Sequence, residues 1–296
     1  MSEDPLSILP RRLGRRAFVT ASAAGALVGW GCSKPEPVAR GATRVASGRG
    51  APVNAWPRLL AGRDALDGDQ ARVRRLFPQV AGDHQDPFVL LDDFRVAPPA
   101  GFPLHPHRGF EAFTYMLDGA FHHRDTMGND SIVHTGGTQR FTSGRGARHS
   151  EMPAAPQVNR GLQLWVNLPR ELKAIEPEYA AVDGADIPEE GRRGAIVRTV
   201  VGPGSPSRLR TAVTYLDLSA PEAGVRHEAE VPSGHKALVY VVDGAVKVGD
   251  RPVRAGEAAL PVPGELLVEA EVPARWVLLH GREQHQPIRH RGPYVD

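Results

Sequence analysis

From Trp56 to Asp296, short runs of apolar residues alternate with turn-forming residues. Several runs alternate apolar and polar positions, which is typical of half-buried β-strands, and DG or GG dipeptides close them as in hairpin turns. The first half contains five such runs: RVRRLFP (72–78), DPFVLLDDF (86–94), AFTYMLDG (112–119), DSIVHTGG (130–137) and GLQLWVNLP (161–169). This pattern predicts an all-β chain.

The second half repeats the pattern and indicates an internal duplication. Its runs are AIVRTVVG (195–202), RLRTAVTYLDLS (208–219), HKALVYVVDGAVKVG (235–249), AALPVPGELLVEA (258–270) and RWVLLHG (275–281). The segment YMLDG (115–119) resembles YVVDG (240–244), and each is followed by a further strand and a glycine at a turn, Gly137 or Gly256. Two related β-barrels in tandem are therefore predicted.

The segments between the runs set the expected domain boundaries. Residues 171–193 are polar and rich in Pro and Glu, so they are predicted to connect the barrels, with a short helix in ELKAIEPEYA (171–180). The first barrel is expected over 56–170 and the second over 194–296.

Composition supports this organisation and excludes some functions. The 296 residues include 32 Gly and 27 Pro, which suit a turn-rich β chain. Net charge is only +2, and no Lys/Arg block beyond the N-terminus resembles a nucleic-acid contact surface, so no nucleic-acid partner is expected. Cys32 is the only cysteine, which rules out an intramolecular disulfide and a cysteine-based metal site.

The N-terminus is predicted to be an export signal. The basic stretch RRLGRRAFVT (11–20) precedes the small and apolar stretch ASAAGALVGWGC (21–32), which is short for a membrane span but typical of a secretory signal. Within it, GRRAFV (14–19) resembles the twin-arginine export motif. We therefore expect residues 1–32 to be a signal peptide of a periplasmic protein. A basic tail without a targeting role is the alternative.

Cys32 raises a second question about the membrane. A lipid on this cysteine would anchor the mature chain, although the bulky Trp30 makes the preceding residues a poor lipidation signal. Without that lipid, no membrane contact is expected. Residues 33–55 are rich in Pro, Gly, Ala and Arg and are predicted to form a flexible linker.

Two pairs of candidate metal ligands lie in the first half: His105-x-His107 and His149-x-Glu151. Residues two apart on a strand share one face, so two such strands can direct four ligands to one interior point. Imidazole and carboxylate suit Fe(II), Mn(II), Ni(II), Cu(II) or Zn(II), and four protein ligands leave two open positions on an octahedral ion. The alternative is a set of surface histidines without a metal.

Other histidines are expected to have no such role. His122 and His123, beside Arg124-Asp125, are predicted to lie in a solvated turn, with the barrel entrance as an alternative. In the second half, His227 and His235 are eight positions apart and no His-x-His or His-x-Glu pair occurs. A second metal site is therefore not expected, and the second barrel is predicted to be structural.

The ligand pairs lie in HPHRGFE (105–111) and GRGARHSEMP (144–153). Together with DPFVLLDDF before them and GLQLWVNLP after them, these segments closely resemble the pirin family, over about 58–294. The resemblance implies a bicupin of two jelly-roll barrels with one metal site, usually iron. It matches His105, His107, His149 and Glu151 to the family's ligands.

Some positions near the predicted site differ from the family pattern. Thr138 stands where many pirins have Asp, and Arg140-Phe141 where Trp-Met is usual. These residues flank the ligands, so the resemblance says less about the substrate than about the metal. Glu111 lies four residues after His107, where metal-binding cupins often place a ligand. We expect it to orient a histidine instead.

The resemblance implies an enzyme as the first hypothesis. Bacterial pirins resemble quercetin 2,3-dioxygenases, so a monomeric Fe(II)-dependent dioxygenase acting on a flavonol-like substrate and O2 is expected, with Glu151 or Glu111 as proton acceptor. Eukaryotic nuclear pirins suggest a non-enzymatic redox-sensing co-regulator, which export to the periplasm would not allow. A metal-binding protein without turnover is the third hypothesis, because cupins host many chemistries.

Overall fold

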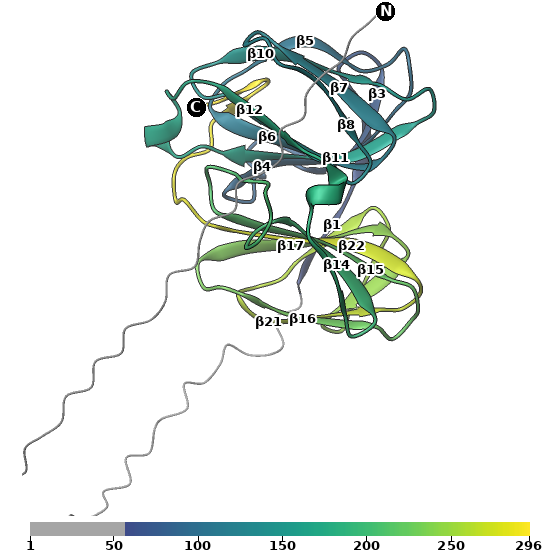
Figure 1. The fold of residues 1–296 in the computed structure, drawn as a ribbon. Helices are drawn as coiled ribbons and strands as arrows, with labels where there is room; N and C mark the ends of the chain where they lie inside the picture. The colour runs from purple at the N-terminus through teal and green to yellow at the C-terminus, as the bar shows by residue number, and fades with distance from the viewer. Residues whose placement is uncertain (1–56) are drawn as a thin grey trace, which may run out of the picture. The chain divides into compact units, whose positions relative to one another are not determined.

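The computed structural model describes residues 57–296, which fold into two β-barrels, each built from a seven-stranded and a four-stranded antiparallel sheet (Figure 1). This confirms the predicted all-β bicupin. The expected signal peptide and the whole expected linker lie outside the described residues. Among the described residues, no helix is long and apolar enough to cross a membrane.

The first half contains a large and a small sheet. The large sheet has the strand order β12-β9-β6-β11-β4-β3-β2 and the small sheet β5-β10-β7-β8. Their bounds are β2 Arg63–Asp67, β3 Ala71–Phe77, β4 Phe88–Val96, β5 Phe102–His107, β6 Phe110–Asp118, β7 Ala120–Asp125, β8 Asp130–His134, β9 Thr138–Thr142, β10 Ala147–Pro153, β11 Asn159–Asn167 and β12 Glu178–Val182. Each of the five apolar runs of this half forms a strand.

The second half repeats the same order. Its large sheet runs β1-β20-β17-β22-β15-β14-β13 and its small sheet β16-β21-β18-β19. Their bounds are β1 Arg58–Ala61, β13 Glu189–Arg192, β14 Ala195–Val201, β15 Val213–Ala220, β16 Arg226–Val231, β17 His235–Asp243, β18 Ala245–Val248, β19 Arg251–Arg254, β20 Glu257–Leu260, β21 Gly264–Ala270 and β22 Ala274–Arg282. A hairpin of β23 (His290–Arg291) and β24 (Tyr294–Val295) follows.

Several strands lie outside the boundaries expected from the sequence. β1 precedes the first half but pairs with β20 of the second. β12, in the expected connection, pairs with β9, and β13 pairs with β14. The connection also holds two 3₁₀ helices, Arg170–Leu172 and Gly184–Asp186. These strands are only four or five residues long and lie at sheet edges, where one neighbour suffices, so their sequences lack the long apolar run of a central strand.

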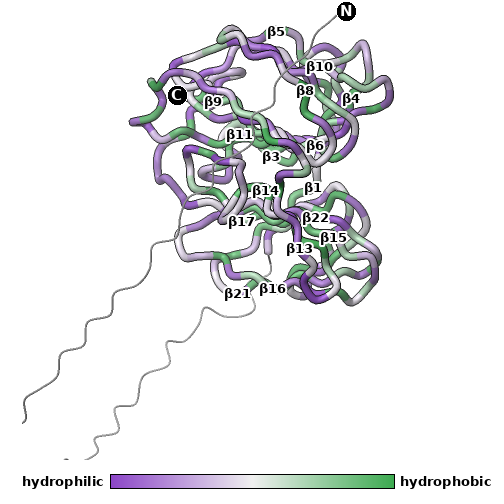
Figure 2. The backbone as a smooth tube through the Cα atoms, viewed as in Figure 1, coloured by the Kyte–Doolittle hydropathy of each residue, from purple (hydrophilic) through white to green (hydrophobic). Residues whose placement is uncertain are grey.

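The two large sheets pack against each other through one apolar core. This core takes Phe113 and Tyr115 from β6 and Leu238 and Tyr240 from β17. The alternate residues of β6, such as Ala112, face the interior of the first barrel instead. β6 is thus buried on both faces, and Figure 2 shows hydrophobic segments along central strands of both halves.

Two equivalent polar clusters connect the halves. The Tyr115 hydroxyl donates to Asp217 Oδ2 at 2.7 Å, and Arg275 donates to both oxygens of Asp217 at 3.0 and 2.7 Å. In return, the Tyr240 hydroxyl donates to Asp93, which Arg160 holds in the same two-bond geometry. Each tyrosine therefore satisfies the carboxylate of the opposite half, which aligns the two sheets.

The interface cluster leads to a stability prediction. Replacing Asp217, whose side chain is 4% exposed, by Asn should lower the free energy of unfolding by about 3 kcal/mol, because Arg275 and Tyr115 lose a buried carboxylate. Urea unfolding measures this change. The control is Asp243→Asn, since Asp243 also contacts an arginine but is 60% exposed, and it should cost less than about 1 kcal/mol. Equal losses in the two variants would contradict the assignment.

Candidate metal centre

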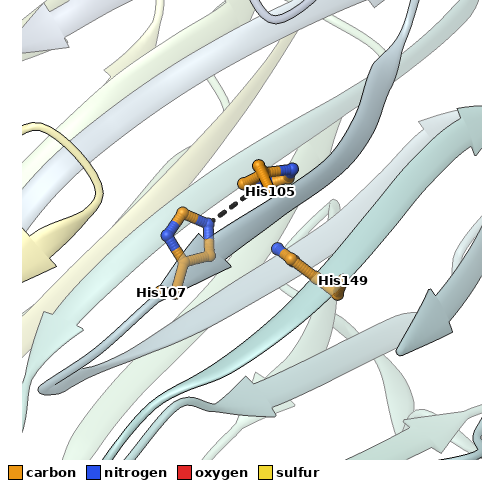
Figure 3. A group of neighbouring side chains, drawn as sticks. All are labelled: His105, His107 and His149. Carbon is orange, nitrogen blue, oxygen red and sulfur yellow. Dashed lines mark hydrogen bonds between the residues drawn. The ribbon is translucent and has the colours of Figure 1, made fainter. Parts of the chain in front are cut away.

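Three histidines converge inside the first barrel, on two neighbouring strands of its small sheet. β5 carries His105 and His107 on one face, and β10 pairs antiparallel with β5 so that His149 lies directly opposite His105. One ring nitrogen from each of the three lies within 4.8 Å of the others. Figure 3 shows the three side chains gathered on their two strands. The structure therefore brings together three of the four ligands predicted from the sequence.

Backbone carbonyls define the protonation of two of these rings. Nδ1 of His105 lies 2.8 Å from the Pro103 carbonyl oxygen, and Nδ1 of His107 lies 3.2 Å from that of Pro293. A carbonyl oxygen only accepts hydrogen bonds, so each Nδ1 carries the proton and each Nε2 presents a lone pair. These two Nε2 atoms are only 3.0 Å apart. Two lone pairs facing each other at this distance repel unless a cation lies beside both.

His149 has the same need for a partner. Its side chain is 1% exposed and stacks on Phe141 with ring centroids 4.2 Å apart, yet neither ring nitrogen has a hydrogen-bond partner in the described chain. Burial and the neighbouring histidines hold its pKa well below the usual value, and burial lowers the pKa of His107 to about 3. Neutral imidazoles are the form that binds a metal, so these residues fit a divalent ion.

Glu151 lies beside the three histidines within a set of hydrogen bonds. Its Oε2 is 4.0 Å from Nε2 of His149 and accepts a bond from Gln163 at 2.8 Å. Its Oε1 accepts bonds from the Thr114 hydroxyl and the Gln139 amide. The carboxylate is thus oriented toward the centre and held by three donors, whether it serves as a fourth ligand or as a proton acceptor.

Glu111 does not belong to this group. It shares the face of β6 with Phe113, toward the second half, whereas the metal centre lies on the opposite face. Its carboxylate accepts bonds from the Thr142 hydroxyl at 2.8 Å and the Arg210 backbone N–H at 2.7 Å, and burial raises its pKa. In the described chain no hydrogen bond joins Glu111 to a histidine of the centre. The structure therefore does not support the prediction that Glu111 orients a histidine.

A cavity of about 520 Å³ opens onto the centre. His105, His107 and Glu151 line it, and its apolar wall includes Phe94, Phe102 and Trp165. A charged wall faces them, where Arg75 donates to both oxygens of Asp92 at 3.0 and 2.7 Å. A cavity of this size and lining fits a small aromatic molecule.

Known proteins share this architecture. The "Pirin" family model matches residues 70–166, and the "Pirin C-terminal cupin domain" model matches residues 215–296. The chain belongs to the pirin family. A pirin-like protein of Solanum lycopersicum is 40% identical over 253 residues, covering 81% of this chain and 87% of that protein. Pirin of Homo sapiens is 35% identical over 245 residues, covering 79% and 84%.

A solved structure gives the same result for the fold. The crystal structure of quercetin 2,3-dioxygenase from Acinetobacter baumannii superposes with a TM-score of 0.74 at 30% sequence identity. The match covers 81% of this chain and 91% of that chain.

The structure corrects the expectation for two neighbouring histidines of this pirin. His122 and His123 lie on strand β7 and not in a turn. His122 faces outward and bonds Asp130, but His123 is fully buried, stacks on Tyr179 and lies 5.3 Å from the His149 ring. In FHHRD (121–125) the buried Phe121 and His123 alternate with the less buried His122 and Arg124, as expected for a half-buried strand. The charged residues next to the histidines favoured the prediction of a turn instead.

Other residues of the site were missed from the sequence. Gln139 and Gln163 hold Glu151, and Trp165 in turn donates to Gln163 Oε1 at 3.0 Å. In GLQLWVN, the polar Gln163 within an apolar strand was a detectable signal. The Pro293 carbonyl had none, because it lies 186 residues from His107.

The second barrel has an apolar interior at the corresponding positions. Its small sheet contributes Val231, Leu266 and Val268 to a core of aliphatic side chains around Trp276. The two barrels thus share strand order but not the chemistry of their interiors.

The three-histidine centre predicts one metal ion per chain. His105→Ala and His149→Ala should each weaken Ni(II) or Co(II) binding at least about 100-fold, since even outer-shell changes at metal sites cost 10–100-fold. Competition with a chelator measures the affinity. His122→Ala, on the outer face of β7, should bind metal like the wild type. Wild-type affinity in His149→Ala would place the ion elsewhere.

Proposed function

We propose that this pirin is a metal-dependent dioxygenase that acts on a flavonol-like substrate with O2. The observation that carries the proposal is a cluster of three imidazoles, two of which, His105 and His107, line an aromatic-walled cavity. The similarity to quercetin 2,3-dioxygenase of Acinetobacter baumannii supports the same reaction class. That activity belongs to the Acinetobacter baumannii protein, and for this chain it is a proposal.

Iron is the metal we propose. Three imidazoles and a nearby carboxylate suit Fe(II), and also accept Mn(II), Ni(II), Cu(II) or Zn(II), because affinity in such sites depends on geometry and supply. A bound divalent ion would supply the positive charge that stabilises a deprotonated substrate oxygen. Metal analysis of protein purified from its native compartment identifies the ion.

The chain's own residues supply positioning and proton transfer. Phe102 and Trp165 offer flat apolar surfaces that orient an aromatic ring and exclude water. Glu151 accepts the proton of the substrate hydroxyl, since its carboxylate lines the cavity and is already aimed at the centre. Gln139 and Gln163 keep that carboxylate in place during the transfer.

The reaction can be tested by oxygen uptake. Protein loaded with Fe(II) or Mn(II) should consume O2 in the presence of quercetin, and Glu151→Gln should lower turnover by about 10²–10⁴-fold, the usual contribution of a general base. His149→Ala with the same added metal measures the oxidation of quercetin by metal that is not bound at the three-histidine centre. Absence of uptake with any flavonol would leave a metal-binding or redox-sensing protein without turnover.

The metal content of Glu151→Gln separates its two roles. A variant that keeps its metal but loses turnover identifies Glu151 as a proton acceptor. A variant that loses its metal identifies a fourth ligand.

We also propose that the chain is exported by the twin-arginine route with its metal already bound, since this route carries folded proteins. Support comes from GRRAFV (14–19) before a small apolar stretch. Replacing Arg15 and Arg16 by Lys should retain the protein in the cytoplasm, as fractionation of cells would show. Export of that variant at the normal level would refute the proposal.

A further inference from the structure

The chain after β22 leaves the second barrel and crosses to the first, as the yellow trace in Figure 1 shows. We call residues 283–296 the C-terminal segment. Asp86 Oδ2 accepts bonds from the backbone N–H groups of Gln284 at 3.0 Å and His285 at 2.8 Å. The side-chain amides of Gln284 and Asn167 also pair, at 2.7 Å. These bonds anchor the beginning of the segment to the first half.

The end of the segment pairs with Arg108, the residue directly after β5 and its two histidines. Val295 N–H donates to the Arg108 carbonyl at 3.0 Å, and the Pro293 carbonyl accepts from Nδ1 of His107. Val295 is fully buried among aromatic side chains of the first barrel, including Trp165. Gly109 has φ +85°, and a Cβ there would lie 1.9 Å from the Val295 oxygen. The close approach therefore requires glycine at this position.

The Lys173 side chain joins the segment to Gly109, two residues after His107. Lys173 follows the 3₁₀ helix Arg170–Leu172, and its Nζ donates to the carbonyls of Gly109 and Val295 and to Oδ1 of Asn167, each at 2.9 Å. An ammonium group has three protons, so all of its donors are used.

A second side-chain link at this end is more exposed. Arg108 bonds both oxygens of Asp296, but the two side chains are 45% and 51% exposed, so water and salt screen the pair. Of these two side-chain links, the partly buried Lys173 is therefore the one better shielded from water and salt.

We propose that Lys173 is a positioning residue for the metal centre, which holds the C-terminal segment against β5 and thereby fixes His107 with its proton on Nδ1. Without the Pro293 carbonyl, the proton of His107 can move to Nε2, where it would donate to Nε2 of His105, 3.0 Å away. That state removes a lone pair from the centre. The second half thus contributes to the metal site of the first, and the inference rests on metal binding and not on the proposed reaction.

The test compares Lys173→Met with Lys247→Met, the same change at an exposed lysine of the second barrel. Lys173→Met should weaken Ni(II) binding by about 10–100-fold, as expected for loss of an outer-shell contact, and Lys247→Met should leave it unchanged. Competition with a chelator gives both affinities.

A second measurement reads the proton position without metal or substrate. In metal-free protein with ¹⁵N-labelled histidine, long-range ¹H–¹⁵N spectra distinguish the two tautomers, and His107→Gln identifies the His107 signals. Wild type should show Nδ1–H alone, and Lys173→Met should also show Nε2–H. A merely structural role would lower stability without this change.

Deletion of residues 292–296 removes the Pro293 carbonyl directly and serves where Lys173→Met fails to fold. It should show the same loss of affinity and the same second tautomer. Wild-type Ni(II) affinity with a single Nδ1–H tautomer in either variant would overturn the proposal. Flavonol-dependent O2 uptake plays no part in these measurements, so a failed reaction and a failed positioning role are distinguishable.

Discussion

The burial of β6 on both of its faces is the constraint on which the rest of this structure depends. One face packs on the second half through Phe113 and Tyr115, and the other lines the first barrel. Because strand residues alternate between faces, one register decides which side chains contact the partner half and which face the metal centre. The clusters Tyr115–Asp217 and Tyr240–Asp93 hold that register from both sides.

The three histidines of the metal centre are arranged to bind a cation. Nε2 of His105 and Nε2 of His107 lie only 3.0 Å apart, and within the described residues the buried His149 ring has no hydrogen-bond partner, so a cation would satisfy all three rings. Residues of both halves maintain this arrangement, because the carbonyl that orients His107 comes from the C-terminal segment. The second barrel, with the same strand order, packs aliphatic side chains around Trp276 in its interior. Chemistry here belongs to the site and not to the fold.

Sequence patterns predicted much of this protein. The apolar runs marked the central strands, and YMLDG and YVVDG marked equivalent hairpins whose glycines, Gly119 and Gly244, both adopt positive φ. The spacing of His105, His107 and His149 placed them on shared faces of strands. The prediction was wrong for His123, because its charged neighbours suggested a turn. It was also wrong for Glu111, because the family resemblance placed this residue near the histidines whereas it lies on the opposite face of β6. Edge strands such as β12 were missed because they are short and lie in a stretch that is polar as a whole.

The sequence by itself determined the all-β class, the duplication and the strands that bear the histidines, because these depend on a period of two residues that is local to each strand. Only the tertiary structure decided which strand neighbours which, that Glu111 faces the second half, and that Pro293 reaches His107 across 186 positions. Such contacts depend on how two complete sheets pack, and no local periodicity records the packing of one half against the other.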